Sequence, residues 1–298
     1  MKSIEVGGKA LGMLIGLGYL WLLQDNVVLL WGWFLLVMAT LGIPHGAIDH
    51  LLYHKKAGGK SGLQRFIFLY LGIMLIYLVC WVYVPITALI LFLIMSAYHF
   101  GQANFIPIKV EKNKSIVYLC TGFFFLAVIL FGDFDRTSEI LQPMVDIQVF
   151  RPYSTVSIFS LFLLSSLLIL SLKSQKKYYC LLELSTLGLI LYHMPLLLAF
   201  ITYFGFWHAL PSLIEEYENL TFQDSTSKPL SFVKQLLPFS LISLFGITLI
   251  LVFFDKWLSE NELTFLFFVM VSLISAPHIW VMNMFLEDPS KHHVPLSK

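Results

Sequence analysis

Histidines inside long apolar segments are the residues of this sequence with the most evident chemical potential. His45, His99, His208 and His278 each lie well within an apolar stretch. An ionisable side chain at membrane depth is costly, so each is a candidate for a functional site. Neutral imidazole nitrogens are suitable ligands for iron, zinc, copper or nickel. We therefore interpret the four histidines as candidate metal ligands.

Chain spacing predicts that the four histidines share one depth. In each case the first charged residue of the following loop or flank is 7 to 10 residues further along, which at 1.5 Å per residue is roughly 10–15 Å. The pairs are His45 and Lys55, His99 and Lys109, His208 and Glu215, and His278 and Glu287. If their helices all run toward the same face, the imidazoles form one layer.

Other polar residues near these positions are candidates for supporting roles. Asp49 follows His45 by one helical turn, and we expect its carboxylate to orient His45 or a neighbouring ligand. His50 points about 140° away from His45 around the helix, so the two are not expected to share a metal. The role of His54 stays open. Glu183 is interpreted as structural, with a place beside a metal ligand as the alternative.

Aromatic residues are dense around the proposed layer. They are predicted to line a channel for a long, flat, apolar substrate, or alternatively to face lipid or form belts at the membrane interface. The six candidates for the channel wall are Tyr98, Phe100, Tyr203, Phe206, Trp207 and Trp280.

Composition places these residues in a membrane protein. Of the 298 residues, 58% are hydrophobic and 12% are charged, whereas a soluble domain carries about 25% charged residues. This excludes a soluble globular enzyme and a disordered chain, and the formal net charge of +1 gives no basic surplus for nucleic-acid binding. The three cysteines have no paired spacing, which argues against a disulfide framework or a thiolate metal site.

The apolar runs predict an all-α, polytopic membrane helix bundle of about ten transmembrane helices. A helix needs about 20 apolar residues to cross the hydrocarbon core, whereas a β-barrel would show short alternating strands. The predicted spans are 10–24, 27–53, 66–84, 86–106, 115–132, 153–172, 178–194, 196–215, 236–254 and 263–286.

Basic residues predict the orientation of the bundle. With ten alternating spans and a cytoplasmic N-terminus, 16 of the 19 Lys and Arg residues fall on the cytoplasmic side. This asymmetry is typical of membrane proteins and places both termini in the cytoplasm. We expect residues 1–298 to form one integral domain that spans the plasma membrane several times.

Four short motifs carry a resemblance to a known family. They are Pro44-His45-Gly46-Ala47-Ile48-Asp49, Tyr98-His99-Phe100-Gly101-Gln102, Phe206-Trp207-His208 and Ala276-Pro277-His278. Their order and spacing, from about residue 40 to residue 285, resemble the Brp/Blh family of bacterial and archaeal membrane β-carotene 15,15′-dioxygenases. The resemblance implies cleavage of β-carotene by O₂ at an Fe(II) site to give two retinal molecules, and a supply of retinal to a microbial rhodopsin.

The resemblance also implies roles for individual residues. His45, His99 and His208 match family histidines tied to iron, and His278 matches the Pro-His motif near the C-terminus. The sequence departs from the family at Ser212, where many members have a histidine four residues after the one that matches His208. A neutral hydroxyl binds Fe(II) poorly, so His278 is the expected fourth ligand. Asn104 stands where an Asp often follows the His-Phe-Gly motif.

Other classes of membrane protein remain as alternatives. A di-iron hydroxylase or desaturase needs several clustered histidine boxes, which this sequence lacks. A transporter would show inverted repeats, and a haem protein would use histidines as axial ligands. A non-catalytic factor for rhodopsin assembly is a third alternative.

Overall fold

The chain is helical throughout the part that the structure describes. A computed structural model describes residues 2–22, 26–57, 62–106, 108, 110–220 and 227–287, and these ranges contain no strand. The prediction of an all-α fold is therefore confirmed. In chain order the elements are α1 (Lys2–Leu22), α2 (Val27–Val37), η1 (Met38–Gly42), α3 (Ile43–Gly46), α4 (Asp49–Ala57), α5 (Gly62–Tyr83), α6 (Pro85–Asn104), α7 (Lys114–Gly132), α8 (Phe134–Leu141), η2 (Gln148–Tyr153), α9 (Ser154–Leu170), α10 (Lys177–Tyr192), α11 (Leu196–Thr202), η3 (Tyr203–Ala209), α12 (Leu210–Asn219), α13 (Lys228–Phe254) and α14 (Glu260–Leu286).

Eight helical stretches of the described chain are long and apolar enough to cross a membrane. They are Val27–Tyr53, Gly62–Tyr83, Pro85–Asn104, Lys114–Gly132, Gln148–Leu170, Leu196–Asn219, Lys228–Phe254 and Glu260–Leu286. The predicted spans 10–24 and 178–194 correspond to α1 and α10, which are not among the eight; α10 has only 16 residues. The structure thus supports a polytopic membrane protein, while ten spans and cytoplasmic termini stay predictions.

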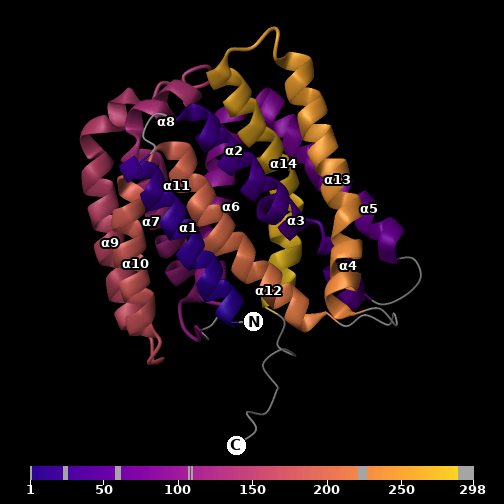
Figure 1. The fold of residues 1–298 in the computed structure, drawn as a ribbon, viewed down its shortest axis with the longest axis horizontal. Coiled ribbons are helices and arrows are strands. Elements are labelled where there is room, and N and C mark those ends of the chain that lie inside the picture. The colour runs from indigo at the N-terminus through magenta and orange to yellow at the C-terminus, as the bar shows by residue number, and fades with distance from the viewer. Residues whose placement is uncertain are drawn as a thin grey trace, which may run out of the picture.

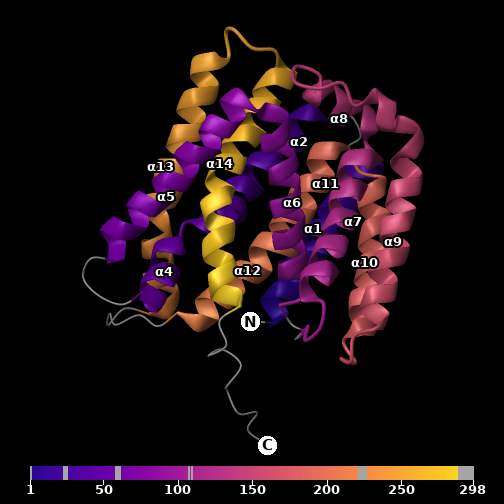
Figure 2. The ribbon, with the colours of Figure 1, turned by 180° about the vertical axis from the view of Figure 1, so that it is seen from behind.

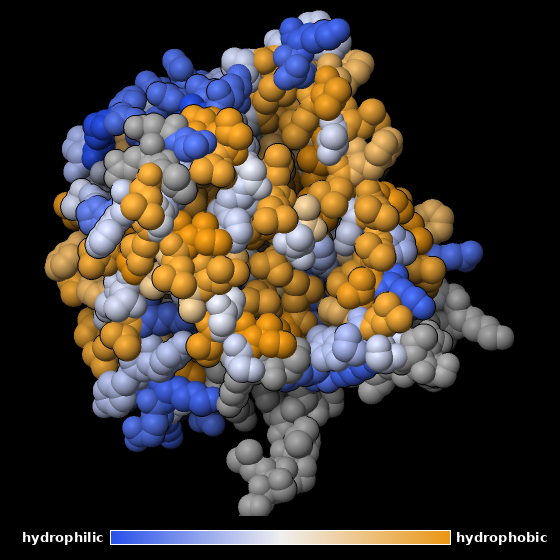
Figure 3. All heavy atoms as spheres, viewed as in Figure 1, coloured by the Kyte–Doolittle hydropathy of each residue, from blue (hydrophilic) through white to orange (hydrophobic). Residues whose placement is uncertain are grey.

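Apolar side chains cover the outside of the bundle. Trp21, Leu22 and Val28 each expose more than 80% of their surface. Figure 3 shows hydrophobic residues over the middle of the visible face and hydrophilic residues gathered toward its two ends. Extensive exposed apolar surface is unusual for a soluble protein. This distribution matches a bundle surrounded by lipid.

The helices form a broad bundle with a different pair of helices along each of its two sides. Figures 1 and 2 show α9 and α10 along one side and α5 and α13 along the other. Between them lie α6, α14 and the continuous segment formed by α11, η3 and α12. Three of the four histidines predicted to form one layer come from this middle region, on α6, η3 and α14, and the fourth comes from α3, which contacts α14 and α13.

Two glycines let α6 and α7 pack backbone against backbone. A Cβ atom on Gly101 would lie 1.9 Å from the carbonyl oxygen of Tyr118, and one on Gly122 would lie 1.8 Å from that of Ala97. No larger residue fits at either position without moving a helix. Since Ala97 and Gly101 flank His99 on α6, this close packing fixes where the His99 side chain projects.

Two π-helical segments lie beside the histidines of the first and third motifs. The segment η1 ends at Gly42, three residues before His45, and η3 contains His208. The two segments contact each other, and a Cβ on Gly42 would lie 2.7 Å from Cε1 of Phe204 in η3. A π turn holds more residues than an α turn, and such turns are frequent at functional sites. They rotate the following side chains away from the positions that regular α-helical spacing predicts.

The packing of α6 on α7 makes a testable prediction about stability. Gly101→Ala should destabilise the protein by about 1–3 kcal/mol, because the methyl group forces the two backbones apart. Gly72→Ala is the control: a Cβ there meets nothing within 4 Å, so this change should be neutral or stabilising by up to about 1 kcal/mol. Unfolding of both variants in detergent micelles measures the difference. Equal stability of the two variants would contradict the packing account.

Candidate metal centre

The four histidines lie together in the interior of the bundle. His45, His99, His208 and His278 expose 5% or less of their surface. The ring centroid of His45 lies 4.4 Å from that of His278 and 5.0 Å from that of His208. The His99 ring is 4.5 Å from His208, 5.2 Å from His278 and 6.1 Å from His45. Side chains more than 200 residues apart in sequence therefore form one cluster of imidazoles.

Three of the four histidines form the tightest group. His45, His99 and His278 each offer a ring nitrogen within 4.8 Å of those of the other two, and all three are buried. His208 is outside this group, although its ring contacts those of His45 and His99. A small cavity of about 60 Å³ adjoins all four rings.

Asp49 contacts the outer nitrogen of His278. The Nδ1 atom of His278 lies 2.9 and 3.0 Å from the two carboxylate oxygens of Asp49, which is 1% exposed. The hydroxyl of Tyr70 lies 3.3 Å from the same carboxylate and 3.2 Å from the carbonyl oxygen of Ile274. Of the two options that the sequence left open, the contact of Asp49 is thus with the neighbouring candidate ligand, His278, and not with His45.

Glu216 lies against Nδ1 of His45, as Asp49 does against Nδ1 of His278. It was not predicted from the sequence. Its Oε1 atom lies 3.1 Å from Nδ1 of His45, and its side chain is fully buried. Sequence reasoning missed it because Glu215 and Glu216 together resemble the polar end of a membrane span. A usable signal was its spacing from His208: eight residues place it about 80° further around an α-helix, within the stripe that can face the interior of a bundle.

The two carboxylates determine which ring nitrogens are free to bind a cation. An ionised carboxylate accepts hydrogen bonds only, so each one favours a proton on the Nδ1 atom that it contacts. The Nε2 atoms of His45 and His278 then carry lone pairs, and these two atoms lie 2.9 Å apart. At this distance the two nitrogens are held either by an N–H···N hydrogen bond, when one ring carries its proton on Nε2, or by a cation that both of them bind. A carboxylate behind each histidine is also the usual arrangement at protein metal sites.

The ring nitrogens of the other two histidines are also suitable ligands for a transition metal. Neither ring nitrogen of His99 makes a regular hydrogen bond with the described residues, and the same holds for Nδ1 of His208. Buried polar atoms normally have a partner, so these nitrogens are available as ligands. Imidazole nitrogens suit iron, zinc, copper and nickel. A divalent ion would also offset the negative charge that Asp49 and Glu216 bring into apolar surroundings.

Phe100 is the predicted channel residue that lies at the histidines. Its ring centroid is 4.7 Å from that of His208, and its side chain lines the cavity beside the four rings. Phe204, in η3, packs nearly parallel to His208 at 5.5 Å and lines the same cavity. Aromatic rings therefore form one wall of the site.

The other five predicted channel residues do not line this cavity. Their main contacts are made elsewhere in the bundle: Tyr98 with Asn283, Tyr203 with Asn104, Phe206 with Trp33, Trp207 with Glu183, and Trp280 with Tyr53. These contacts are hydrogen bonds for Tyr98, Tyr203 and Trp207, and ring packing for Phe206 and Trp280. Such contacts give these residues a role in holding the helices around the site.

Glu183 has the structural role that we preferred from the sequence. Its Oε1 atom accepts hydrogen bonds from Nζ of Lys9 at 2.8 Å and from Nε1 of Trp207 at 2.7 Å. These bonds connect α1, α10 and η3. Because Trp207 precedes His208, the ion pair supports the segment that carries this histidine.

The remaining sequence candidates lie around the cluster. His50 packs against Phe239 at 4.7 Å and is not part of the cluster. The side chain of His54 is outside the described residues. Ser212 is fully buried, one turn after His208 and one turn before Glu216, and its hydroxyl makes no hydrogen bond within the described chain.

Comparison with known proteins identifies one family. The family model described as Beta-carotene 15,15'-dioxygenase matches residues 36–286. This range contains all four histidines together with Asp49 and Glu216. No curated protein and no solved structure matches the chain.

The carboxylate contacts predict the strength of metal binding. Asp49→Asn and Glu216→Gln should each weaken binding of a divalent ion by about 10–100-fold, because each change removes the group that fixes a ligand ring. Titration of metal-free protein in detergent with Co(II), followed by its visible absorption, measures the affinity. His193→Ala is the control, because this residue is exposed at the end of α10. If both carboxylate variants bind Co(II) as tightly as the control, the proposed arrangement is wrong.

Proposed function

Because the chain belongs to the beta-carotene 15,15′-dioxygenase family, we propose that it cleaves the central double bond of β-carotene with O₂ and releases two molecules of retinal. One C=C bond breaks and two C=O bonds form, and the two atoms of O₂ account for the two aldehyde oxygens. No further co-reactant is required. The observation that carries the proposal is the buried cluster of histidines inside the region that matches the family.

We assign an Fe(II) ion to His45, His99 and His278, with His208 as the fourth ligand. The position of His208 against two of the other rings supports its inclusion. Bound there, iron would supply the redox chemistry with O₂. The 2.9 Å between Nε2 of His45 and Nε2 of His278 leaves no room for a porphyrin between them, which argues against this pair as axial haem ligands.

The polar side chains beside the histidines hold the ring protons in place and fix the orientation of the rings. Asp49 keeps a proton on Nδ1 of His278, and Glu216 keeps one on Nδ1 of His45, so both Nε2 atoms stay available. Tyr70 in turn holds Asp49 through its hydroxyl. No residue has to act as a general base, since the overall reaction moves no proton.

The apolar side chains position the substrate and exclude water. The cavity at the histidines is lined mainly by aliphatic and aromatic residues, including Phe92, Phe100, Phe200 and Phe204. Such walls suit a polyene that has no polar group near its central bond. Positioning the bond and excluding water are the contributions that a protein makes when a cofactor carries the chemistry.

The surrounding bilayer is the natural source of the substrate. β-Carotene is insoluble in water and dissolves in the hydrocarbon core, and the chain exposes an apolar surface to that core. We propose the plasma membrane as its location, from the distribution of Lys and Arg residues. Delivery of retinal to a microbial rhodopsin stays a prediction.

Expression in cells that make β-carotene tests the activity. Wild-type protein should bleach the cells and accumulate retinal, and His99→Ala should abolish both. The loss of retinal formation in His99→Ala should exceed the roughly 10–100-fold loss expected when only a group beside a metal ligand is removed. Extraction and chromatography of the pigments, with the protein quantified in the membrane fraction, measure the result.

Matched variants then separate the ligands from other histidines. His208→Ala and His278→Ala should lose retinal formation and bound iron together, whereas His193→Ala should keep both. Wild-type cells that stay orange and contain no retinal, with iron supplied and the protein present, would overturn the proposed function.

A further inference from the structure

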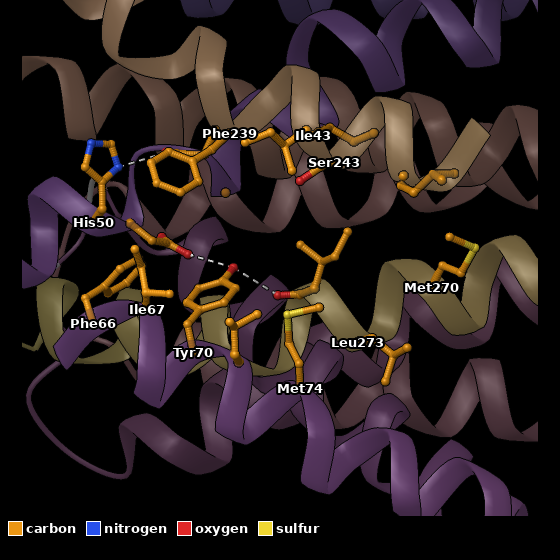
Figure 4. A pocket seen from close by; sticks show the side chains of 18 of the residues that line it. Ile43, His50, Phe66, Ile67, Tyr70, Met74, Phe239, Ser243, Met270 and Leu273 are labelled. Carbon is orange, nitrogen blue, oxygen red and sulfur yellow. Dashed lines mark hydrogen bonds between the residues drawn. The ribbon is translucent and has the colours of Figure 1, made fainter. Parts of the chain in front are cut away.

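A large cavity lies between α5 and α13, outside the histidine cluster. Its volume is about 400 Å³, within the range of small-molecule pockets. Figure 4 shows Phe66, Tyr70 and Met74 of α5 on one side, with Phe239 and Ser243 of α13 opposite. Nearly all of its walls are apolar, so the cavity suits an apolar ligand.

The outer end of this cavity reaches the lipid-facing surface. Two of its lining residues on α5, Ile67 and Leu71, expose 36% and 55% of their surface. On α13, Ile242 and Ile250 expose 67% and 38%. The gap between the two helices is therefore flanked by side chains that would contact acyl chains.

The inner end of the cavity reaches the histidines. Four residues line both this cavity and the small one at the cluster: Ile43, Gly46, Ile247 and Ile274. Gly46 forms part of the boundary, since a Cβ there would lie 3.6 Å from Nδ1 of His278. The two polar groups at this end, Asp49 and Tyr70, are hydrogen bonded to each other. The passage toward the cluster therefore presents few unsatisfied polar atoms.

A third cavity lies on another side of the cluster. It has a volume of about 110 Å³ and shares Phe92, Ser96, Phe100 and Phe200 with the cavity at the histidines. None of its lining residues is exposed. The histidines thus adjoin two apolar spaces, and exposed side chains line only the larger one.

We propose that the cavity between α5 and α13 is the port through which the carotenoid passes from the bilayer to the histidines. In the bound state one half of the molecule lies in this cavity and the other half extends into the smaller one. The central double bond then lies at the cluster. This inference rests on the proposed function, because it takes the ligand to be a long polyene cleaved at its middle.

Gly246 on α13 offers a way to block the port. It lines the cavity, and a Cβ there meets nothing within 4 Å, so a larger side chain has space to enter. Gly72 on α5 also has nothing within 4 Å of a Cβ, but it does not line the cavity. Gly246→Phe and Gly72→Phe are therefore a matched pair that adds the same side chain inside and outside the port.

The first readout is retinal formation in liposomes that contain β-carotene at limiting concentration. Gly246→Phe should lower the rate at least about tenfold, while Gly72→Phe should match the wild type. Both variants should bind iron as the wild type does, which shows that the site is intact. Gly246→Ala, a smaller addition, should retain most of the activity.

The second readout is binding without turnover. In the His99→Ala background, β-carotene that copurifies with the protein should fall when Gly246→Phe is added and stay unchanged when Gly72→Phe is added. Wild-type liposomes that form no retinal would overturn the proposed function itself. Retinal formation and carotenoid retention that are equal in the Gly246→Phe and Gly72→Phe proteins would overturn the port alone.

Discussion

Two buried carboxylates and the imidazoles they contact set the arrangement of the site. Asp49 and Glu216 lie in an apolar bundle, where an ionised carboxylate is stable only with a hydrogen-bonded or charged partner. Asp49 is hydrogen bonded to Nδ1 of His278, Glu216 lies at ion-pair distance from Nδ1 of His45, and the Nε2 atoms of the two histidines face each other at 2.9 Å. Two nitrogens at this distance share a proton or bind a common cation. The polar groups are therefore stabilised as a set, and the three closest histidines of that set could hold a metal ion.

The fold serves this arrangement by bringing distant segments into close contact. Glycines at 101 and 122 let α6 approach α7 through backbone atoms, which fixes the helix that carries His99. The π-helical segments η1 and η3 contact each other beside His45 and His208. On the open side, α13 leaves a lipid-facing gap against α5. One part of the bundle is thus tightly packed to hold ligands, and another is loosely packed to admit an apolar molecule.

The sequence predicted the helical membrane fold and the clustering of the histidines, because long apolar runs and isolated intramembrane histidines are visible without a structure. Asp49 was also found, from its spacing of one turn from His45. Glu216 was missed, because a glutamate at the end of a span is ordinary and only the packing of α12 against α3 directs it to His45. The channel was predicted from the aromatic residues near the histidines, but residue type alone does not show toward which part of the bundle a side chain points. Most of those rings hold helices together, and the open cavity is lined by aliphatic residues and glycines together with three other aromatic residues, Phe66, Tyr70 and Phe239.

X-ray absorption at the iron edge of the purified, iron-loaded protein tests the central claim most directly. We expect the iron to be surrounded by nitrogen and oxygen atoms only, with the multiple-scattering signature of three or four imidazoles. We also expect His278→Ala to lower the imidazole count by one in the iron that remains. An environment without imidazole scattering, or one that is unchanged when His45 and His278 are replaced together, would contradict the claim.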